Sequence, residues 1–442
     1  LSGISTECYV AKYNSAGVFV WAKNIGMANL QEGTGLTVHN NQLILVGNYG
    51  NGGGIDLDPG PGTVLTPTVN NNGMFISKFD LNGNFIWGNG FACFSKPVIE
   101  GVKIDNANNI VVCGNFQYTI DFDPSASTAS LTATSYDGFI AKYDSNGNYV
   151  WAMKIGTADN DLVNDLCIDI NNNIYCTGSY MGTVNFNPLG TTTNLTSNVG
   201  VANAFVAKYG ANGVLKWANA IGSTSTDIGR SIQFDKLGNI IYAGVFGGVV
   251  DFDAGVGVTS LTANTANRGI FISKIDTANN FVWAKDFGGT LTDDISEIAI
   301  DSSNQIIATG MMSPGMNFSP SGTFNVTSKG SSDAYIAKYS KTGALVWAYP
   351  IGGSATDWGI SLDVNQTDNT IYTTGYFNST NLDLNISSTV NTTITTNGGE
   401  DIYIAKYSQC DIVSPPVNIT PTVNLTMCEG VTTTLTASAS VT

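Results

Sequence analysis

One short strand sequence occurs seven times along this chain, and that repetition constrains the fold more than any other feature. Each copy reads aromatic, aliphatic, Ala or Ser, then Lys, usually followed by Tyr. The lysines lie 64 to 68 residues apart, at Lys12, Lys78, Lys142, Lys208, Lys274, Lys338 and Lys406. A period of this length indicates structural units that stack on one another. The fold must therefore accommodate about 66 residues per unit.

Each unit predicts four short strands in two hairpins. Six copies of the lysine strand are followed by a turn such as Asp144-Ser-Asn-Gly147-Asn, and Asx-rich turns ending in Gly indicate a hairpin because Gly accepts the positive φ that a tight return requires. The next strand carries a tryptophan, at Trp21, Trp87, Trp151, Trp217, Trp283 or Trp347. A second hairpin with alternating apolar positions follows, as in 168–178 and 232–244.

The four strands of one unit cannot bury both faces of their own sheet. Radial stacking of the sheets buries those faces and protects most strand edges, so we expect an all-β chain folded as a β-propeller of four-stranded antiparallel blades. An open solenoid or a string of separate sandwiches is the alternative. Low charge (12%) and 50 glycines suit short strands and turns, and no long helix is expected.

These residues resemble the SBBP-type β-propeller repeat of secreted proteins from Bacteroidetes-like bacteria. That pattern runs DxFIAKYDxxGxxxWAxxIGG, then a strand with Asp, NIYxTGxF and DFDPGxG, and the resemblance covers residues 1 to about 407. It implies that the Ile-x-x-Asp strand is innermost, the Asn-Ile-Tyr strand second, the lysine strand third and the tryptophan strand outermost. It also implies secretion or display at the outer cell surface, by type IX export.

On this phasing five complete blades span about 33 to 352. A hairpin made of a third and an outer strand precedes them, and a sheet of three strands without its outer strand follows them. Leu1 aligns with Leu131, inside a unit, so we expect sequence to be missing upstream. Seven blades are favoured for the natural protein, with six as the alternative and an incomplete ring in this fragment. The expected domains are a propeller at 1–409, a Pro-rich linker at 410–421 and the truncated start of an immunoglobulin-like domain at 422–442.

Charge excludes some partners. The formal net charge is −16, which argues against nucleic acid because phosphate neutralisation needs clustered Lys and Arg. No apolar run approaches the roughly 20 residues that cross a bilayer. A polysaccharide or protein ligand is the expected partner.

The recurrent lysines and tryptophans are expected to be structural. A lysine inside an apolar strand needs a partner, and a repeated Asp is predicted to supply an ion pair. The tryptophans are predicted to pack between blades, as large rigid aromatics do when sheets stack.

Two sets of acidic residues are candidate sites. Asp-x-Asp elements, with Asn in other copies, suit either a calcium loop or Asx turns and lysine pairing; the carboxylate-rich copies are Asp56, Asp58, Asp121, Asp123, Asp251 and Asp253. A second set follows the outer strand at the presumed channel rim, where the carboxylates either bind a ligand or cap backbone: Asp161, Asp227, Asp293 and Asp357. Beside them Trp358 lies outside the repeat and either stacks on a sugar ring or fills a gap.

Two covalent features are also expected. Cys167 and Cys176 flank Asn171-Asn172, and a two-residue turn there would place them opposite one another, where they form a disulfide or simply fill the core. Thr277 lies in an Asp-Thr-Ala sequence of the kind to which the related bacteria attach O-glycans.

The sequence favours a non-catalytic binding or adhesion scaffold over an enzyme. A catalytic group is needed once, whereas most conspicuous residues here recur, and a single histidine builds no Ser-His-Asp triad. A carbohydrate-active hydrolase or lyase using channel-rim carboxylates is the first alternative. A purely structural spacer is the second.

Overall fold

The computed structural model describes residues 8–26, 30–50, 54–67, 72–263, 268–289, 291–385, 393–396 and 399–409. These residues form strands and turns, with no helix and hence no helix suited to crossing a membrane. They fall into two compact units, Leu1–Asp286 and Phe287–Thr442. The expected linker (410–421) and immunoglobulin-like segment (422–442) lie outside the described residues.

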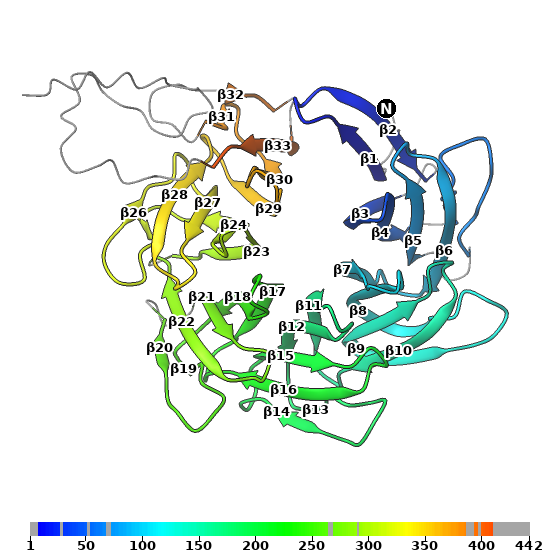
Figure 1. The fold of residues 1–442 in the computed structure, drawn as a ribbon, viewed down its shortest axis with the longest axis horizontal. Coiled ribbons are helices and arrows are strands. Elements are labelled where there is room, and N and C mark those ends of the chain that lie inside the picture. Colours follow the sequence, from blue (N-terminus) through cyan, green and yellow to red (C-terminus); the bar gives the residue numbers. More distant parts are fainter. Residues whose placement is uncertain are drawn as a thin grey trace, which may run out of the picture. The chain divides into compact units, whose positions relative to one another are not determined.

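The first unit contains one hairpin and four four-stranded antiparallel sheets (Figure 1). The hairpin pairs β1 (Cys8–Tyr13) with β2 (Phe19–Ile25). The sheets are β3 (Leu30–His39), β4 (Gln42–Gly50), β5 (Asn72–Asp80) and β6 (Phe85–Cys93); β7 (Val98–Ile104), β8 (Ile110–Asp121), β9 (Ser130–Tyr143) and β10 (Tyr149–Ile155); β11 (Leu162–Ile168), β12 (Ile174–Tyr180), β15 (Asn203–Tyr209) and β16 (Leu215–Ile221); and β17 (Ile228–Phe234), β18 (Ile240–Phe246), β21 (Gly269–Ile275) and β22 (Phe281–Phe287), the last ending at the unit boundary.

The second unit contains one four-stranded and one three-stranded sheet. The first consists of β23 (Asp294–Ile300), β24 (Ile306–Met312), β27 (Asp333–Tyr339) and β28 (Leu345–Ile351). The second consists of β29 (Asp357–Val364), β30 (Ile371–Phe377) and β33 (Asp401–Tyr407).

Short two-stranded ribbons are inserted between the second and third strands of four sheets, and these the sequence did not predict. They pair β13 (Thr183–Asn185) with β14 (Asn194–Thr196), β19 (Val249–Asp251) with β20 (Ser260–Thr262), β25 (Met316–Asn317) with β26 (Asn325–Val326), and β31 (Leu382–Asp383) with β32 (Thr393–Ile394). In the β7–β10 sheet the same segment simply extends β8 and β9.

The prediction of an all-β propeller of four-stranded antiparallel blades is confirmed. The strand order within the sheets is also the expected one, since in the third sheet β11, β12, β15 and β16 pair in that order. Among the described residues there are five complete blades, a preceding hairpin and a following three-stranded blade, as the phasing predicted. These make six blade sheets, and a seven-bladed natural form stays a prediction.

Apolar side chains from consecutive sheets of the first unit form shared cores. One core joins Ile44 and Ile76 of the β3–β6 sheet to Val112 and Phe139 of the β7–β10 sheet. In Figure 1 the first strands β3, β7, β11 and β17 lie on the inner side of this unit, and β6, β10, β16 and β22 lie on its outer side. Each blade therefore buries its faces against its neighbours, which a single four-stranded sheet could not do.

Of the two possibilities for Cys167 and Cys176, the structure shows core filling rather than a disulfide, because both thiols are free and buried. The turn is longer than two residues: Asp169 N donates to Asn173 O, and Ile168 lies opposite Ile174. This register places Cys167 opposite Tyr175 and Cys176 opposite Leu166. The two thiols consequently belong to different apolar cores on opposite faces of the sheet.

Candidate ligand-binding face of the innermost strands

Ion pairs between the recurrent lysine and an Asp in the first turn of the same blade are present in three blades. Each lysine crosses the second strand to reach the carboxylate, and all six side chains are at least nine-tenths buried. The pairs are Lys142–Asp105 (2.7 Å), Lys274–Asp235 (2.6 Å) and Lys338–Asp301 (3.0 Å). Burial opposes ionisation of Asp105 and Asp235, but hydrogen bonds from the lysine and from an Asn hold the pKa of both carboxyls below the usual value.

Three of the recurrent lysine and tryptophan pairs in the first unit also donate hydrogen bonds to the next blade. Lys78 Nζ and Trp87 Nε1 both donate to Ser145 O, at 2.7 and 3.3 Å, in the turn before the outer strand of the following blade. The same carbonyl is shared by Lys12 and Trp21 (Leu81 O) and by Lys142 and Trp151 (Ala211 O). These residues therefore have a structural role.

A glycine in that turn is required for the contact. Gly147 has φ +83°, and a Cβ there would lie 3.0 Å from a ring atom of Trp87. A Cβ at Gly83 would likewise lie close to the ring of Trp21, and a Cβ at Gly213 would lie close to the ring of Trp151. The repeated Gly thus serves both the left-handed turn and the close approach of the indole.

The four acidic residues predicted at the rim are buried and accept backbone hydrogen bonds. Oδ2 accepts an amide just after the outer strand, from Thr157 (2.8 Å), Ser223 (2.7 Å), Gly289 (2.6 Å) or Gly353 (2.9 Å). Oδ1 accepts an amide just after the second strand, from Met181 (2.8 Å), Gly247 (2.9 Å), Ser313 (2.7 Å) or Ser379 (3.2 Å). Asp161, Asp227, Asp293 and Asp357 thus each tie three strand ends together. Their role toward a ligand stays a prediction.

Burial changes the pKa of these aspartates. Desolvation raises the pKa of Asp161 and of Asp227 to about 6, while the backbone amides oppose that rise. Trp358, next to Asp357, is half-buried; its Nε1 donates to Ser296 Oγ at 2.9 Å, and its ring centroid lies 6.0 Å from that of Tyr376. Stacking of Trp358 on a sugar also stays a prediction.

The Asp-x-Asp elements form Asx turns. Oδ1 of Asp121 accepts the amides of Asp123 (3.1 Å) and Ala129 (2.8 Å), and Asp56 and Asp251 make the equivalent bonds. Oδ1 of the second residue, Asp58, Asp123 or Asp253, accepts an amide two residues later. Asn185 accepts the same two amides as its Asp counterparts, so the turn needs an oxygen acceptor rather than a charge.

Calcium at these turns stays a prediction. Within the described ranges no three His, Cys, Asp or Glu side chains are placed to hold a metal ion together. Calcium usually takes six to eight oxygen ligands. The donor sets therefore fit the Asx turn better than they fit the ion.

Every innermost strand carries a β-bulge at the same position, which the sequence analysis missed. The register shifts between Ile99 and Gly101 in β7, and between Gly229 and Ser231 in β17. A bulge inserts one residue that is not paired across the strands and re-aims its side chain. The inserted residues are Thr34, Glu100, Asn164, Arg230, Ser296 and Ile360.

The bulge residues differ from blade to blade, unlike the recurrent lysines and tryptophans. In the first unit Glu100 is exposed, and Asn115 Nδ2 donates to its Oε1 at 3.3 Å. Desolvation by the neighbouring strands raises the pKa of Glu100, and the positive charge of Arg230 opposes that rise. Asn164 Nδ2 donates to Gly229 O at 2.7 Å, in the innermost strand of the next blade. The inner face of this unit therefore presents three different polar side chains, those of Glu100, Asn164 and Arg230.

The carboxylate that follows a bulge has a structural partner. Asp165 Oδ2 accepts Ser231 Oγ (3.0 Å) and Ile232 N (2.9 Å) from β17, and Glu297 Oε2 accepts Leu362 N (2.9 Å) from β29. Both bonds join the innermost strands of adjacent blades. These two acids consequently contribute to blade packing.

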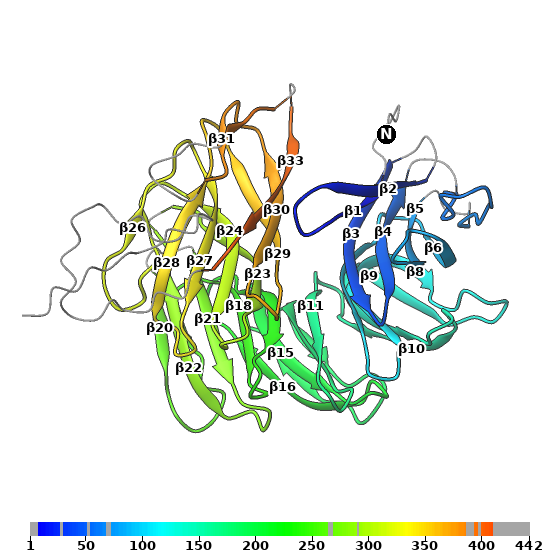
Figure 2. The ribbon, with the colours of Figure 1, turned by 45° about the horizontal axis from the view of Figure 1, so that its top comes forward.

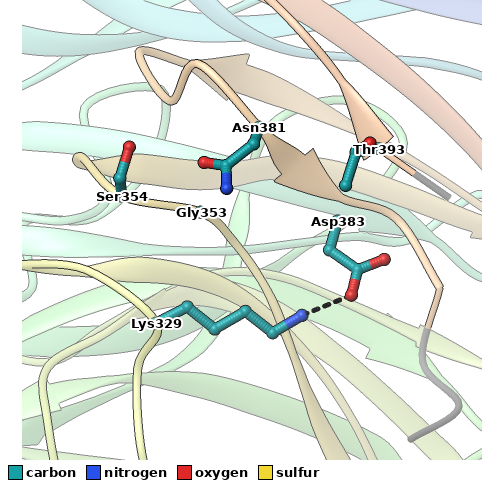
Figure 3. Close-up of a pocket in the computed structure, with 6 residues that line it drawn as sticks. All are labelled: Lys329, Gly353, Ser354, Asn381, Asp383 and Thr393. Carbon is teal, nitrogen blue, oxygen red and sulfur yellow. Dashed lines mark hydrogen bonds and ion pairs between the residues drawn. The ribbon is translucent and has the colours of Figure 1, made fainter. Parts of the chain in front are cut away.

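A small polar cavity of about 220 Å³ lies in the second unit (Figure 3). It is lined by Lys329, Gly353, Ser354, Asn381, Asp383 and Thr393. Lys329 Nζ and Asp383 Oδ2 form an ion pair at 2.7 Å, and Asp383 Oδ1 accepts Asn385 N at 3.0 Å. Because its charges pair with each other, this cavity offers little net charge to a ligand.

Comparisons with known proteins support the repeat character of this β-propeller. The chain is 27% identical over 490 residues to an uncharacterized WD repeat-containing protein of Acanthamoeba polyphaga mimivirus, with 92% of this chain aligned. The chain spans 34% of the length of that protein. No family model matches the sequence.

Among solved structures, a protein of unknown function from Bacteroides caccae is similar with a TM-score of 0.37 and 9% identity. That alignment covers 78% of this chain and 94% of the other.

Proposed function

We propose that this protein is a non-catalytic binding scaffold whose ligand contacts the bulge residues of the innermost strands. The observation that carries the proposal is the contrast between the variable bulge position and the lysines, tryptophans and buried aspartates that recur. The recurrent lysines, the tryptophans and the four buried aspartates that join strand ends have structural roles. The bulge position, by contrast, holds a different side chain in every blade.

The chemistry of these side chains suits a polysaccharide. Glu100, Asn164 and Arg230 supply carboxylate, amide and guanidinium groups, which together donate to and accept from sugar hydroxyls. A repeating polymer would meet several blades at once, so modest contacts would add through multivalency. What supports a location outside the cell is the resemblance to the SBBP-type repeat of secreted proteins.

A glycan array tests this proposal on the full chain, with and without calcium. We expect binding to a defined set of polysaccharides, weakened about tenfold or more in a Glu100→Gln/Arg230→Gln double variant. Lys216→Gln is the matched control, because Lys216 is an exposed cation on the outer strand β16. Equal binding by the double variant and the control would remove the site from the inner face. Binding lost by Asp357→Asn and Trp358→Ala instead would assign it to the rim.

A carbohydrate-active hydrolase is the second candidate, and the observation that favours it is that desolvation raises the pKa of Glu100, the direction in which the pKa of a general acid is shifted. If the protein were such an enzyme, Glu100→Gln would abolish the release of reducing ends and preserve polysaccharide binding. A scaffold would show no release in either form. A spacer would show neither release nor binding.

A further inference from the structure

Three aromatic side chains are exposed together where the β3–β6 and β7–β10 sheets of the first unit meet. Phe94 follows the end of β6, Tyr118 lies in β8 and Tyr136 lies in β9; they are 66%, 49% and 37% exposed. Figures 1 and 2 both show β6 beside β8, and the two strands are in contact. The rings of Phe94 and Tyr118 meet edge to face, with centroids 6.4 Å apart. Tyr136 Oη forms a hydrogen bond with Ser95 Oγ at 3.4 Å. We call Phe94, Tyr118 and Tyr136 the aromatic patch.

The backbone at Tyr118 has a conformation that favours glycine. Its φ is +68°, and it stands two residues after Phe116, the buried aromatic of β8. Two residues after the buried aromatics that end β12 and β18, the next two blades have Gly182 (φ +75°) and Gly248 (φ +60°). A bulky side chain at positive φ is strained, and such strain is concentrated at functional sites. A half-exposed tyrosine at this glycine position therefore indicates a role for its ring at the surface.

The other two residues of the aromatic patch also depart from the repeat. Phe94 is the seventh residue after the tryptophan of its strand, and Tyr136 is the sixth residue before the lysine of its strand. No other copy of the repeat has an aromatic residue at either of these sequence positions. The patch is consequently a feature of one place in the molecule, and blade packing that all units share does not account for it.

Polar groups without net charge flank the patch. The hydroxyls of Thr119 and Thr132, on the exposed side of β8 and β9, lie 2.9 Å apart and can both donate and accept. Lys96, close to the patch in the chain, forms an ion pair with Glu32. These surroundings suit an uncharged ligand that combines an apolar face with hydroxyl groups.

The patch is small for a protein partner. An aromatic side chain buries about 150–250 Å² when fully covered, and these three are already partly covered. A stable protein–protein interface buries about 800 Å² on each partner. Exposed apolar surface of smaller extent fits a small ligand better.

We propose that the aromatic patch binds pyranose rings of a neutral polysaccharide by stacking. A pyranose with equatorial hydroxyls presents a face of axial C–H bonds, which the negatively polarised face of an aromatic ring attracts, while its edge reaches the threonine hydroxyls. The proposal rests on the ligand class of the proposed function, but it uses none of the bulge residues.

Calorimetric titration of the full chain with neutral β-1,4-linked hexasaccharides of glucose, mannose and xylose tests this site. We expect at least one to bind. Tyr118→Gly keeps the left-handed backbone and removes the ring, so we expect about tenfold weaker binding with an unfolding midpoint that is unchanged or higher. Tyr118→Trp keeps a ring and should bind within about threefold of the wild type. Unchanged binding by Tyr118→Gly, or loss of binding by Tyr118→Trp, would contradict stacking.

A second pair of variants provides an independent test and its control. Phe94→Ala should also weaken binding about tenfold, since Ala158 stands at this position in the next blade. Phe324→Ala removes an aromatic side chain that is 45% exposed in the second unit, and it should bind as the wild type does. Equal binding by these two variants would overturn the proposal.

The Glu100→Gln/Arg230→Gln double variant separates this site from the inner face. Weaker binding by Tyr118→Gly with full binding by the double variant would support the aromatic patch and contradict the inner face. The reverse result would contradict the patch alone. Failure of all three hexasaccharides to bind would overturn the proposal, as would a concentration-dependent dimer that Tyr118→Gly dissociates.

Discussion

Two sheets of the second unit contain almost the same third strand in different surroundings. β27 and β33 differ at one of seven positions, Ala334 against Ile402. Every residue of β27 is buried, whereas β33 alternates between buried and exposed. The change from Ala to the more apolar Ile did not increase burial.

This contrast separates what a strand sequence decides from what its neighbours decide. Both strands pair in the same register with a second strand, so pairing follows from local sequence. Burial of the alternate face requires the adjacent sheet, which Ile336 has in the core shared with β29 and β30. The lysines differ as well: Lys338 pairs with Asp301, whereas Lys406 lies 5.8 Å from the ring centroid of Tyr372, and Asn365 stands at the position of Asp301.

Removing the buried carboxylate is expected to have the largest effect on this comparison. Asp301→Ala leaves the Lys338 charge buried without its partner and should lower the free energy of unfolding by about 3 kcal/mol or more. Asn365→Ala should cost about 1 kcal/mol. Denaturant titration followed by tryptophan fluorescence measures both. Asp301→Ala combined with Lys338→Met should recover most of the loss, and equal costs for the two single variants would contradict the buried ion pair.

Truncating the matched isoleucines is expected to have the next largest effect. Ile336→Ala opens a cavity in the core and should cost about 3 kcal/mol. Ile404→Ala removes an exposed side chain and should cost less than about 0.5 kcal/mol. The same denaturation measurement compares them. Similar losses would mean that the face of β33 is covered in solution.

The pH dependence of stability distinguishes the first residues of the two strands. Burial raises the pKa of Asp333 to about 6, and the nearby charge of Asp357 acts in the same direction. The folded state then binds a proton more strongly than the unfolded state, so stability is greatest below about pH 4 and falls as the pH rises through 6, by on the order of 2 kcal/mol for this group.

Asp333→Asn should remove that fall, because the amide oxygen still accepts Lys329 N, which donates to Asp333 Oδ2 at 2.6 Å. Asp401→Asn, at the matching half-exposed position of β33, is the comparison variant. Unfolding midpoints measured from pH 4 to 7 test both variants. A profile unaltered by Asp333→Asn would show that other carboxylates cause the dependence.

The sequence predicted those features that arise from repetition. Period, strand order, blade phasing and the lysine-to-aspartate pairing all follow from side chains recurring at fixed places, since a shared local pattern requires a shared local structure. A repeated Asp was predicted as the partner of the lysine, but the Asp-x-Asp elements were considered for that pairing, whereas Asp105, Asp235 and Asp301 in the first turn form it.

Features that depend on register could not be predicted. Asn171-Asn172 suggested a two-residue turn, but a slip of one residue sends Cys167 and Cys176 to opposite faces. The bulges could not be predicted for the same reason. A bulge is defined by how one strand pairs with its neighbour, and the sequence of a single strand does not show that pairing. The available signal was that the position of Glu100, Asn164 and Arg230 holds a different side chain in each copy of the repeat.

The smallest expected effect concerns the Asx turns of the two sheets. Asn317 Oδ1 accepts Ser319 N, and Asp383 Oδ1 accepts Asn385 N, so amide and carboxylate perform the same task. Asp383→Asn keeps this acceptor and loses only an ion pair to Lys329, whose side chain is 39% exposed, and should change stability by less than about 1 kcal/mol. Asp383→Ala removes the acceptor and should cost more. A midpoint that rises with added calcium in the wild type but not in Asp383→Asn would show that the charge has a task the Asx turn does not explain.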